Sequence, residues 1–184
     1  MLTPKEKKEI LVLARQAMES YVTNGIIKKY ITDNKNLKQQ AGAFVSLHKN
    51  KQLRGCIGMI ESNKPLYETI IEMAMEASSS DPRFEPVKVE ELKDIVLEVS
   101  VLFPKKKIKN LDEIKLGVHG VIVKRGFASG VFLPQVAVET GWSKEQFMEN
   151  LCEGKACLPA DAYKDKETEI YIFEAQVFSE KEIK

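Results

Sequence analysis

Several residue types that stabilise small or metal-dependent proteins are scarce in this sequence of 184 residues. Three cysteines and two histidines are too few, and too widely spaced, for a zinc ribbon or a zinc finger. A sparse and odd number of cysteines is typical of a reducing compartment. The chain has no run of about 18 apolar residues, and its N-terminus lacks the apolar stretch of a signal peptide. We therefore expect a soluble, cytoplasmic protein with no membrane partner and no structural zinc site.

An excess of charge of one sign is also absent, because 28 lysines and arginines face 27 aspartates and glutamates, giving a formal net charge of +1. A near-neutral total argues against a nucleic-acid binder that is held mainly by phosphate contacts. For the local basic run at 105–109, a solvated loop tip is favoured over a phosphate site. No linker rich in proline, serine or glycine divides the chain, so residues 1–184 are expected to form one domain.

Arginine is the scarcest of the charged residues, although lysine is abundant. The four arginines are Arg15, Arg54, Arg83 and Arg125. The planar guanidinium group binds a carboxylate or phosphate through two hydrogen bonds, which lysine cannot do. Each arginine is therefore a candidate either for anion binding or for an internal salt bridge, and the sequence leaves both readings open.

Local signals for helix ends predict three helices and one short helical turn. Residues 3–6 combine an N-cap threonine, a proline suited to the first helical position and a glutamate that can close a capping box. Apolar residues then recur at helical spacing until Gly25 supplies a stop. A second helix is predicted for 65–80, and a third begins after Ser143. A short helical turn is expected at 136–139.

Alternating apolar residues and turn signals predict two hairpins and two further strands. These segments are 43–48 with 53–60, 95–103, 118–124 with 130–133, and 167–177. A symmetric turn in the first hairpin would place Val45 opposite Cys56. In that register Cys56 shares one face with Arg54 and Gly58, and His48 lies on the other face, away from the thiol.

The order of these elements indicates the fold class. Twice along the chain a hairpin is followed by a helix, which suggests two ββα-type units and is compatible with an internal duplication. We therefore predict an α+β fold in which helices pack on a mostly antiparallel sheet.

The segment 53–58, Leu-Arg-Gly-Cys-Ile-Gly, is the most unusual in the sequence. Glycine weakens a strand, so Gly55 and Gly58 imply that something approaches the backbone closely. Cys56 could be a nucleophilic or metal-binding thiol that Arg54 assists. It could equally be a small buried side chain beside a bulge, since no histidine stands at a spacing that would identify its activating base.

This segment resembles the six-residue signature of the AMMECR1 family, and the similarity covers nearly the whole chain. The other matching motifs, in the order and spacing of the family, are Asp81–Phe84, Gly130–Ala137, Gly141–Trp142 and Cys152–Pro159. The resemblance implies an α+β fold with two unequal subdomains, but no settled activity and no known cofactor. It also implies association with a Memo-like protein and a radical-SAM protein, with which bacterial and archaeal members are linked. Cys157 departs from the pattern, because many relatives have glycine there.

The residues and the resemblance together predict a cleft that takes a small anionic ligand. Cys56 is the candidate catalytic residue. The candidate ligand-binding residues are Arg54, Gly55, Gly58, Ser80, Asp81 and Arg83. Asp81 could orient Arg83, act as a base or simply cap its turn. His119 is a second candidate base, although a core or rim position is favoured for it.

Two other functions stay open at this point. The chain could be a non-catalytic partner or scaffold for the Memo-like and radical-SAM proteins. It could also be associated with nucleic acid, which the net charge of +1 disfavours.

Overall fold

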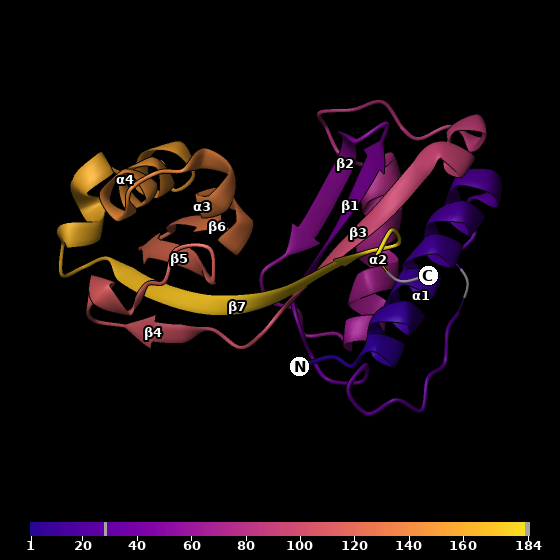
Figure 1. Cartoon of the computed structure of the whole chain (residues 1–184), viewed down its shortest axis with the longest axis horizontal. Helices are drawn as coiled ribbons and strands as arrows, with labels where there is room; N and C mark the ends of the chain where they lie inside the picture. Colours follow the sequence, from indigo (N-terminus) through magenta and orange to yellow (C-terminus); the bar gives the residue numbers. More distant parts are fainter. Residues whose placement is uncertain (28, 183–184) are drawn as a thin grey trace. The chain divides into compact units, whose positions relative to one another are not determined.

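The computed structural model describes residues 1–27 and 29–182, and the chain divides into two compact units of unequal size. Unit 1 comprises Met1–Leu102 and Gln176–Lys184, and unit 2 comprises Phe103–Ala175. Both units combine helices with antiparallel strands (Figure 1). The predicted α+β class with two unequal subdomains is therefore confirmed.

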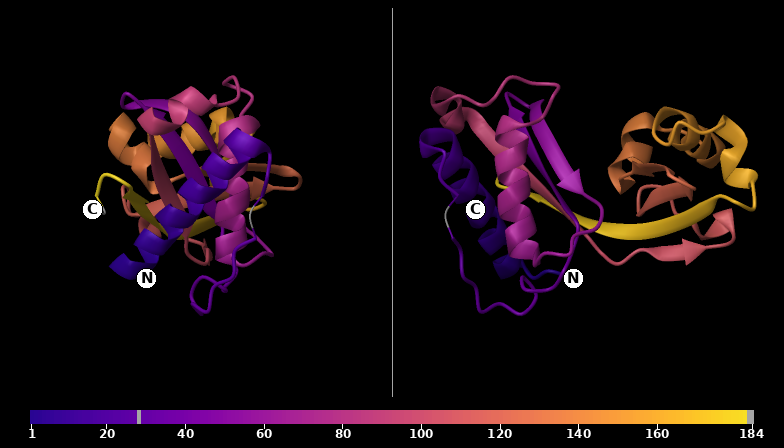
Figure 2. Two further views of the ribbon diagram at one scale, coloured as in Figure 1. Left: turned by 90° about the vertical axis from the view of Figure 1, so that its right-hand side faces the viewer. Right: turned by 180° about the vertical axis from the view of Figure 1, so that it is seen from behind.

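Unit 1 contains an antiparallel sheet in which β2, β1 and β3 are neighbours in that order. Its elements are α1 (Pro4–Asn24), β1 (Ala43–Lys49), β2 (Gln52–Met59), α2 (Leu66–Ser79), the 3₁₀ helix η1 (Val89–Asp94) and β3 (Ile95–Leu102). Helices α1 and α2 lie side by side against the sheet (Figure 2). The apolar core of the unit lies between these layers and includes Val45, Leu47 and Val99 from the sheet and Met18 and Ile70 from the helices.

The predicted ends of α1 are present in the structure. Thr3 is the N-cap and forms a capping box with Glu6, and Gly25 ends the helix in the left-handed conformation with φ of 67°. The hydrogen bond from the Thr3 backbone N–H, followed by that from the Asn36 side chain, lowers the pKa of Glu6 to about 2. Local sequence alone was sufficient here, because a cap depends on residues that are neighbours in the chain.

The first hairpin has a different register from the predicted one. Asn50 and Lys51 form a two-residue turn with φ of 53° and 67°, which is typical of a type I′ hairpin. Beyond the turn His48 pairs with Leu53, but Leu47 pairs with Gly55, so the register shifts by one residue. Arg54 is the extra residue of a β-bulge.

This bulge changes the neighbours of Cys56. The predicted pairing of Cys56 with Val45 is wrong, because Cys56 lies opposite Ser46. Since side chains alternate along a strand, Cys56 shares the face of Ser46 and His48. The prediction that the register separates His48 from the thiol is therefore also wrong, and one unpaired residue is the physical cause.

Unit 2 has the strand order β6-β5-β7-β4. Its elements are β4 (Lys106–Ile108), the 3₁₀ helix η2 (Leu111–Glu113), β5 (His119–Arg125), β6 (Ala128–Phe132), α3 (Pro134–Thr140), α4 (Lys144–Gly154), the 3₁₀ helix η3 (Ala160–Lys164) and β7 (Glu169–Ser179), whose last residues belong to unit 1. The core of the unit includes Val121, Phe147 and Leu151.

The lysine run at 105–109 does not form the expected loop tip. Residues 106–108 are strand β4, and Lys107 pairs with Tyr171 of β7. Ile108 is 5% exposed and belongs to the core of unit 2. A single buried isoleucine together with backbone pairing holds this lysine-rich segment in the sheet, which a reading based on charge could not show.

Each unit contains a succession of strand, strand, helical segment and strand, which is β1-β2-α2-β3 in unit 1 and β5-β6-α3-α4-β7 in unit 2, so the predicted hairpin-then-helix order occurs twice. In both, the first strand is central and the strand after the helical segment pairs with it, as β3 does with β1 and β7 with β5. A glycine on each second strand allows close packing. A Cβ on Gly55 would lie 2.2 Å from the Ala77 carbonyl oxygen, and one on Gly130 would lie 2.6 Å from the Ala156 nitrogen. The backbone of the same unit thus makes the close approach predicted at Gly55.

No helix within residues 1–27 and 29–182 is both long enough and apolar enough to cross a membrane.

Candidate functional site

The candidate thiol lies on β2, on the side of the unit 1 sheet opposite its helices. Cys56 is half-buried, and the Ser46 hydroxyl donates a hydrogen bond to its Sγ at 3.2 Å. The flanking residues of β1, Val45 and Leu47, are fully buried on the helix side. Cys56 is therefore not one of the apolar core residues of unit 1, and its sulfur has a hydroxyl donor.

Asp81 and Arg83 bind the backbone of Cys56 from the outer edge of β2. The Cys56 N–H donates to Asp81 Oδ2 at 2.8 Å, and Arg83 Nη2 donates to the Cys56 carbonyl oxygen at 3.1 Å. Arg83 also donates through Nε to Asp81 Oδ1 at 2.9 Å and through Nη2 to Oδ2 at 2.7 Å. Asp81 and Arg83 thus form hydrogen bonds with the N–H and the carbonyl group of Cys56, which on an edge strand would otherwise be open to pairing with another strand. These bonds fix the position of Cys56.

The two side chains of this ion pair differ in their exposure to solvent. The Asp81 side chain is 2% exposed, whereas that of Arg83 is 56% exposed. The hydrogen bonds from the Arg83 side chain, followed by those from backbone N–H groups, hold the pKa of Asp81 well below its usual range. Asp81 is thus ionised at neutral pH, and it orients Arg83 as well as capping its turn through the Arg83 N–H.

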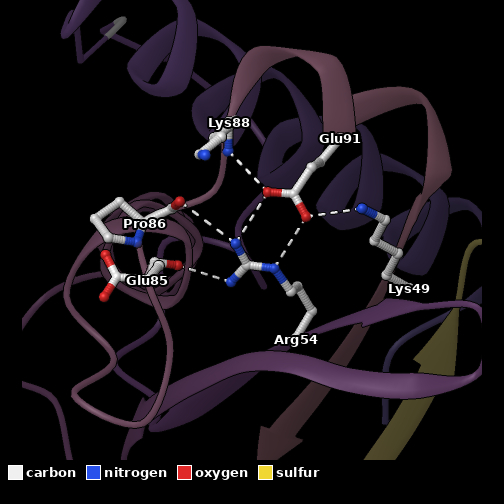
Figure 3. A network of polar contacts seen from close by, with 6 residues as sticks. All are labelled: Lys49, Arg54, Glu85, Pro86, Lys88 and Glu91. Carbon is white, nitrogen blue, oxygen red and sulfur yellow. Dashed lines mark hydrogen bonds and ion pairs between the residues drawn. The ribbon is translucent and has the colours of Figure 1, made fainter.

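Arg54 occupies a separate network (Figure 3). Its Nε and Nη2 donate to the two carboxylate oxygens of Glu91 at 3.1 and 2.9 Å, and its Nη1 donates to the Glu85 carbonyl oxygen at 2.8 Å. The Arg54 side chain is 17% exposed. The hydrogen bond from Arg54, followed by those from the Lys88 backbone and Lys49, lowers the pKa of Glu91 to about 2. These contacts tie the bulge of β2 to the segment 85–91.

The remaining predicted site residues have structural neighbours of their own. A Cβ on Gly58 would lie 2.2 Å from the ring of Phe44, and Gly55 packs on the backbone of α2. Ser80 is exposed at the end of α2, where its hydroxyl pairs with that of Ser79 at 3.1 Å. Hydrogen bonds therefore join Cys56 with Asp81 and Arg83, whereas Arg54 binds Glu91. Ligand binding by Ser80 and the two glycines stays a prediction.

Three polar residues near Cys56 were not predicted. Ser46, His48 and Glu98 share its face of the sheet, because Ser46 pairs with both Cys56 and Glu98. His48 Nε2 lies 3.9 Å from Glu98 Oε1, and this nitrogen is buried without a hydrogen-bond partner in the described structure. No group of three metal-ligating side chains occurs in residues 1–27 and 29–182. Only the bulge at Arg54 brings these residues to the thiol, and no sequence signal marked it.

The other two cysteines belong to unit 2 and differ in exposure. Cys152 is fully buried in α4, and burial raises the pKa of its thiol. Cys157 is exposed and has a φ of 54°, in the left-handed region that favours glycine. This conformation explains why glycine is the expected residue at Cys157.

Comparison with known proteins shows the family of the chain. The AMMECR1 family model matches residues 11–178. The chain belongs to the AMMECR1 family. A relative from Methanothermobacter thermautotrophicus is 44% identical over 186 residues, which cover 97% of this chain and 96% of that protein. One from Methanopyrus kandleri is 42% identical over 98% of this chain and 91% of its own length.

The fold of this AMMECR1-family chain also matches a solved structure. The crystal structure of an uncharacterized protein from Pyrococcus horikoshii superposes with a TM-score of 0.87 at 40% identity. The match covers 94% of this chain and 90% of the other. Family membership thus defines the fold and leaves the activity uncharacterised.

The Arg54–Glu91 contact predicts a measurable stability effect. Arg54→Lys should lower the free energy of unfolding by about 2 kcal/mol, because one ammonium group cannot bind both carboxylate oxygens and two backbone carbonyls. Since Glu91 has a pKa of about 2 when folded, its contribution is complete above the unfolded value of about 4.3 and is lost as the pH falls toward 2. Urea denaturation at several pH values measures both effects. Lys64→Ala, at an exposed pair with Glu72, is the control and should change nothing measurable. Equal results for both variants would contradict a structural role for Arg54.

Proposed function

We propose that Cys56 is the reactive thiol of a small-molecule site in unit 1, and that Arg83 binds an anionic group of the ligand. One observation carries the proposal. The backbone of Cys56 is fixed on both sides by the Asp81–Arg83 pair, while its side chain is half-buried and accepts a hydrogen bond from Ser46. A nucleophile needs this combination of fixed backbone and accessible, hydrogen-bonded sulfur.

Arg83 is suited to the binding role because one nitrogen of its guanidinium group makes no hydrogen bond within residues 1–27 and 29–182. Nε and Nη2 are used by Asp81 and Cys56, but within the described residues Nη1 makes no hydrogen bond. More than half of the side chain is exposed. An incoming carboxylate or phosphate can therefore accept hydrogen bonds from Arg83 without breaking its contacts with Asp81.

In this proposal the other candidates support the site. Gly55 and Gly58 allow β2 to lie close to α2 and to Phe44, and Arg54 holds the bulge that turns Cys56 onto the face of Ser46. Ser80 precedes Asp81 and, being exposed, is a candidate for a further contact with the ligand.

Alkylation of the folded protein tests the proposal. Cys157→Gly is the background, because it removes the exposed second thiol at a position that prefers glycine. Iodoacetamide at pH 7 should label Cys56 of the native chain, as identified by peptide mass spectrometry, and leave the buried Cys152 unmodified. Inorganic phosphate should slow the labelling, and Arg83→Lys should abolish that protection. If Cys56 reacted only after denaturation, the proposal would be overturned.

A further inference from the structure

A polar row crosses the unit 1 sheet beside the thiol. Cys56 of β2 pairs with Ser46 of β1, and Ser46 in turn pairs with Glu98 of β3. His48 lies two residues after Ser46 on the same face of β1. Thiol, imidazole and carboxylate thus gather on three adjacent strands, although they are distant in the sequence.

The imidazole of His48 has an unusual environment. Its Nε2 is buried and makes no hydrogen bond in the described structure, and Glu98 Oε1 lies 3.9 Å from it. A buried polar atom without a partner costs free energy, so native structures retain one where it has a use. If the imidazole took up a proton, the Glu98 carboxylate would stabilise its positive charge, whereas the neutral ring has no charge to stabilise.

We propose that His48 is the acid–base residue for Cys56 and that Glu98 stabilises its protonated form. The inference rests on the function proposed above. The S–H bond of Cys56 breaks, the electron pair remains on Sγ, and the proton forms an N–H bond on His48. Glu98 stays ionised, the Ser46 hydroxyl donates to the sulfur, and the step consumes no further reactant.

Two further charged residues of β1 and β2, Lys49 and Arg54, have a carboxylate partner of their own. On β1, the ammonium of Lys49 pairs with Glu91, and on the β2 bulge Arg54 binds the same carboxylate. On the paired strands β1, β2 and β3, the register places Cys56 of β2 and Glu98 of β3 on the face of His48.

The pH profile of alkylation tests the inference in the Cys157→Gly background. His48→Gln should slow iodoacetamide labelling of Cys56 about 10-fold at pH 7 and move the profile to higher pH, because one favourable charge is lost. Glu98→Gln should also move the pH profile of labelling to higher pH, but by a smaller amount. The control is His119→Gln, which changes the second histidine, a residue of unit 2 whose Nδ1 accepts from the Lys115 backbone. It should leave the profile unchanged.

Histidine NMR provides a second measurement that does not need the His48 variant. The chain has two histidines, so each imidazole signal can be followed separately during a pH titration. Cys56→Ala should shift the titration of His48 and leave that of His119 unchanged, because coupling between two groups is reciprocal.

The outcomes separate the two proposals. If Cys56 is labelled but His48→Gln keeps the wild-type profile and Cys56→Ala leaves the His48 titration unchanged, the acid–base role is wrong and the reactive thiol stands. If folded wild-type chain shows no labelling of Cys56 at any pH where it stays folded, both proposals are wrong.

Discussion

Gly55→Val should lower the free energy of unfolding by at least about 3 kcal/mol. A Cβ at this position would lie 2.2 Å from the Ala77 carbonyl oxygen and 3.4 Å from a methyl group of Leu47. The first contact is with helix backbone, which cannot move aside as the end of a long side chain can. Either α2 or β2 must shift, and both line the buried core of unit 1.

Thermal and urea denaturation measure this effect, and Gly154→Ala is the matched control. Gly154 is the last residue of α4, and a Cβ there would meet nothing within 4 Å. Alanine should therefore stabilise the chain by about 0.5 kcal/mol, through the smaller conformational freedom of the unfolded state. A Gly55→Val protein as stable as the wild type would show that β2 and α2 do not pack as described.

The packing at Gly55 also bears on how the signature segment is interpreted. Sequence alone showed that something approaches the strand closely, but not whether a ligand or the protein does so. In the structure the Ala77 carbonyl fills the space at Gly55 and the Phe44 ring fills it at Gly58. A glycine in a functional motif can thus serve the fold that positions the site.

The elements that sequence predicted well depend on neighbouring residues. The capping boxes at Thr3 and Ser143 are both formed, because the hydrogen bonds join residues three apart. The register of β1 and β2 was predicted correctly next to the turn and wrongly beyond it, since the bulge at Arg54 shifts every later pair. Bulges arise from packing against the rest of the sheet and its neighbours, which a local pattern does not contain.

The arginines show that sequence also has a limit in predicting the candidate site, because it does not reveal which charged side chains stay exposed. Sequence left each of them open between an anion site and an internal ion pair, and all four bind a carboxylate of the chain: Arg15 with Glu180, Arg54 with Glu91, Arg83 with Asp81 and Arg125 with Asp165. Exposure separates them, because Arg15, Arg54 and Arg125 have side chains 17–27% exposed and that of Arg83 is 56% exposed. Burial depends on the tertiary fold, so sequence could nominate Arg83 but could not distinguish it from Arg54.

Asp81→Asn should cost about 3 kcal/mol at neutral pH, because it leaves a nearly buried amide where a carboxylate accepts four hydrogen bonds. The amide nitrogen would face the donors of Arg83 or the N–H of Cys56. Urea denaturation at pH 7 measures the loss. Asp33→Asn, at a fully exposed carboxylate, is the control and should have no measurable effect.

The pH dependence of this loss distinguishes a lost charge from a changed shape. The pKa of Asp81 is lowered in the folded chain by Arg83, so its contribution is complete above the unfolded value of about 3.9 and decreases as the pH falls below it. The difference in stability between wild type and Asp81→Asn should therefore be constant from pH 5 to 7 and narrow below about pH 4. A difference that stayed constant down to the acid transition would show that the amide disturbs packing and that the Asp81–Arg83 ion pair does not hold Cys56 in place.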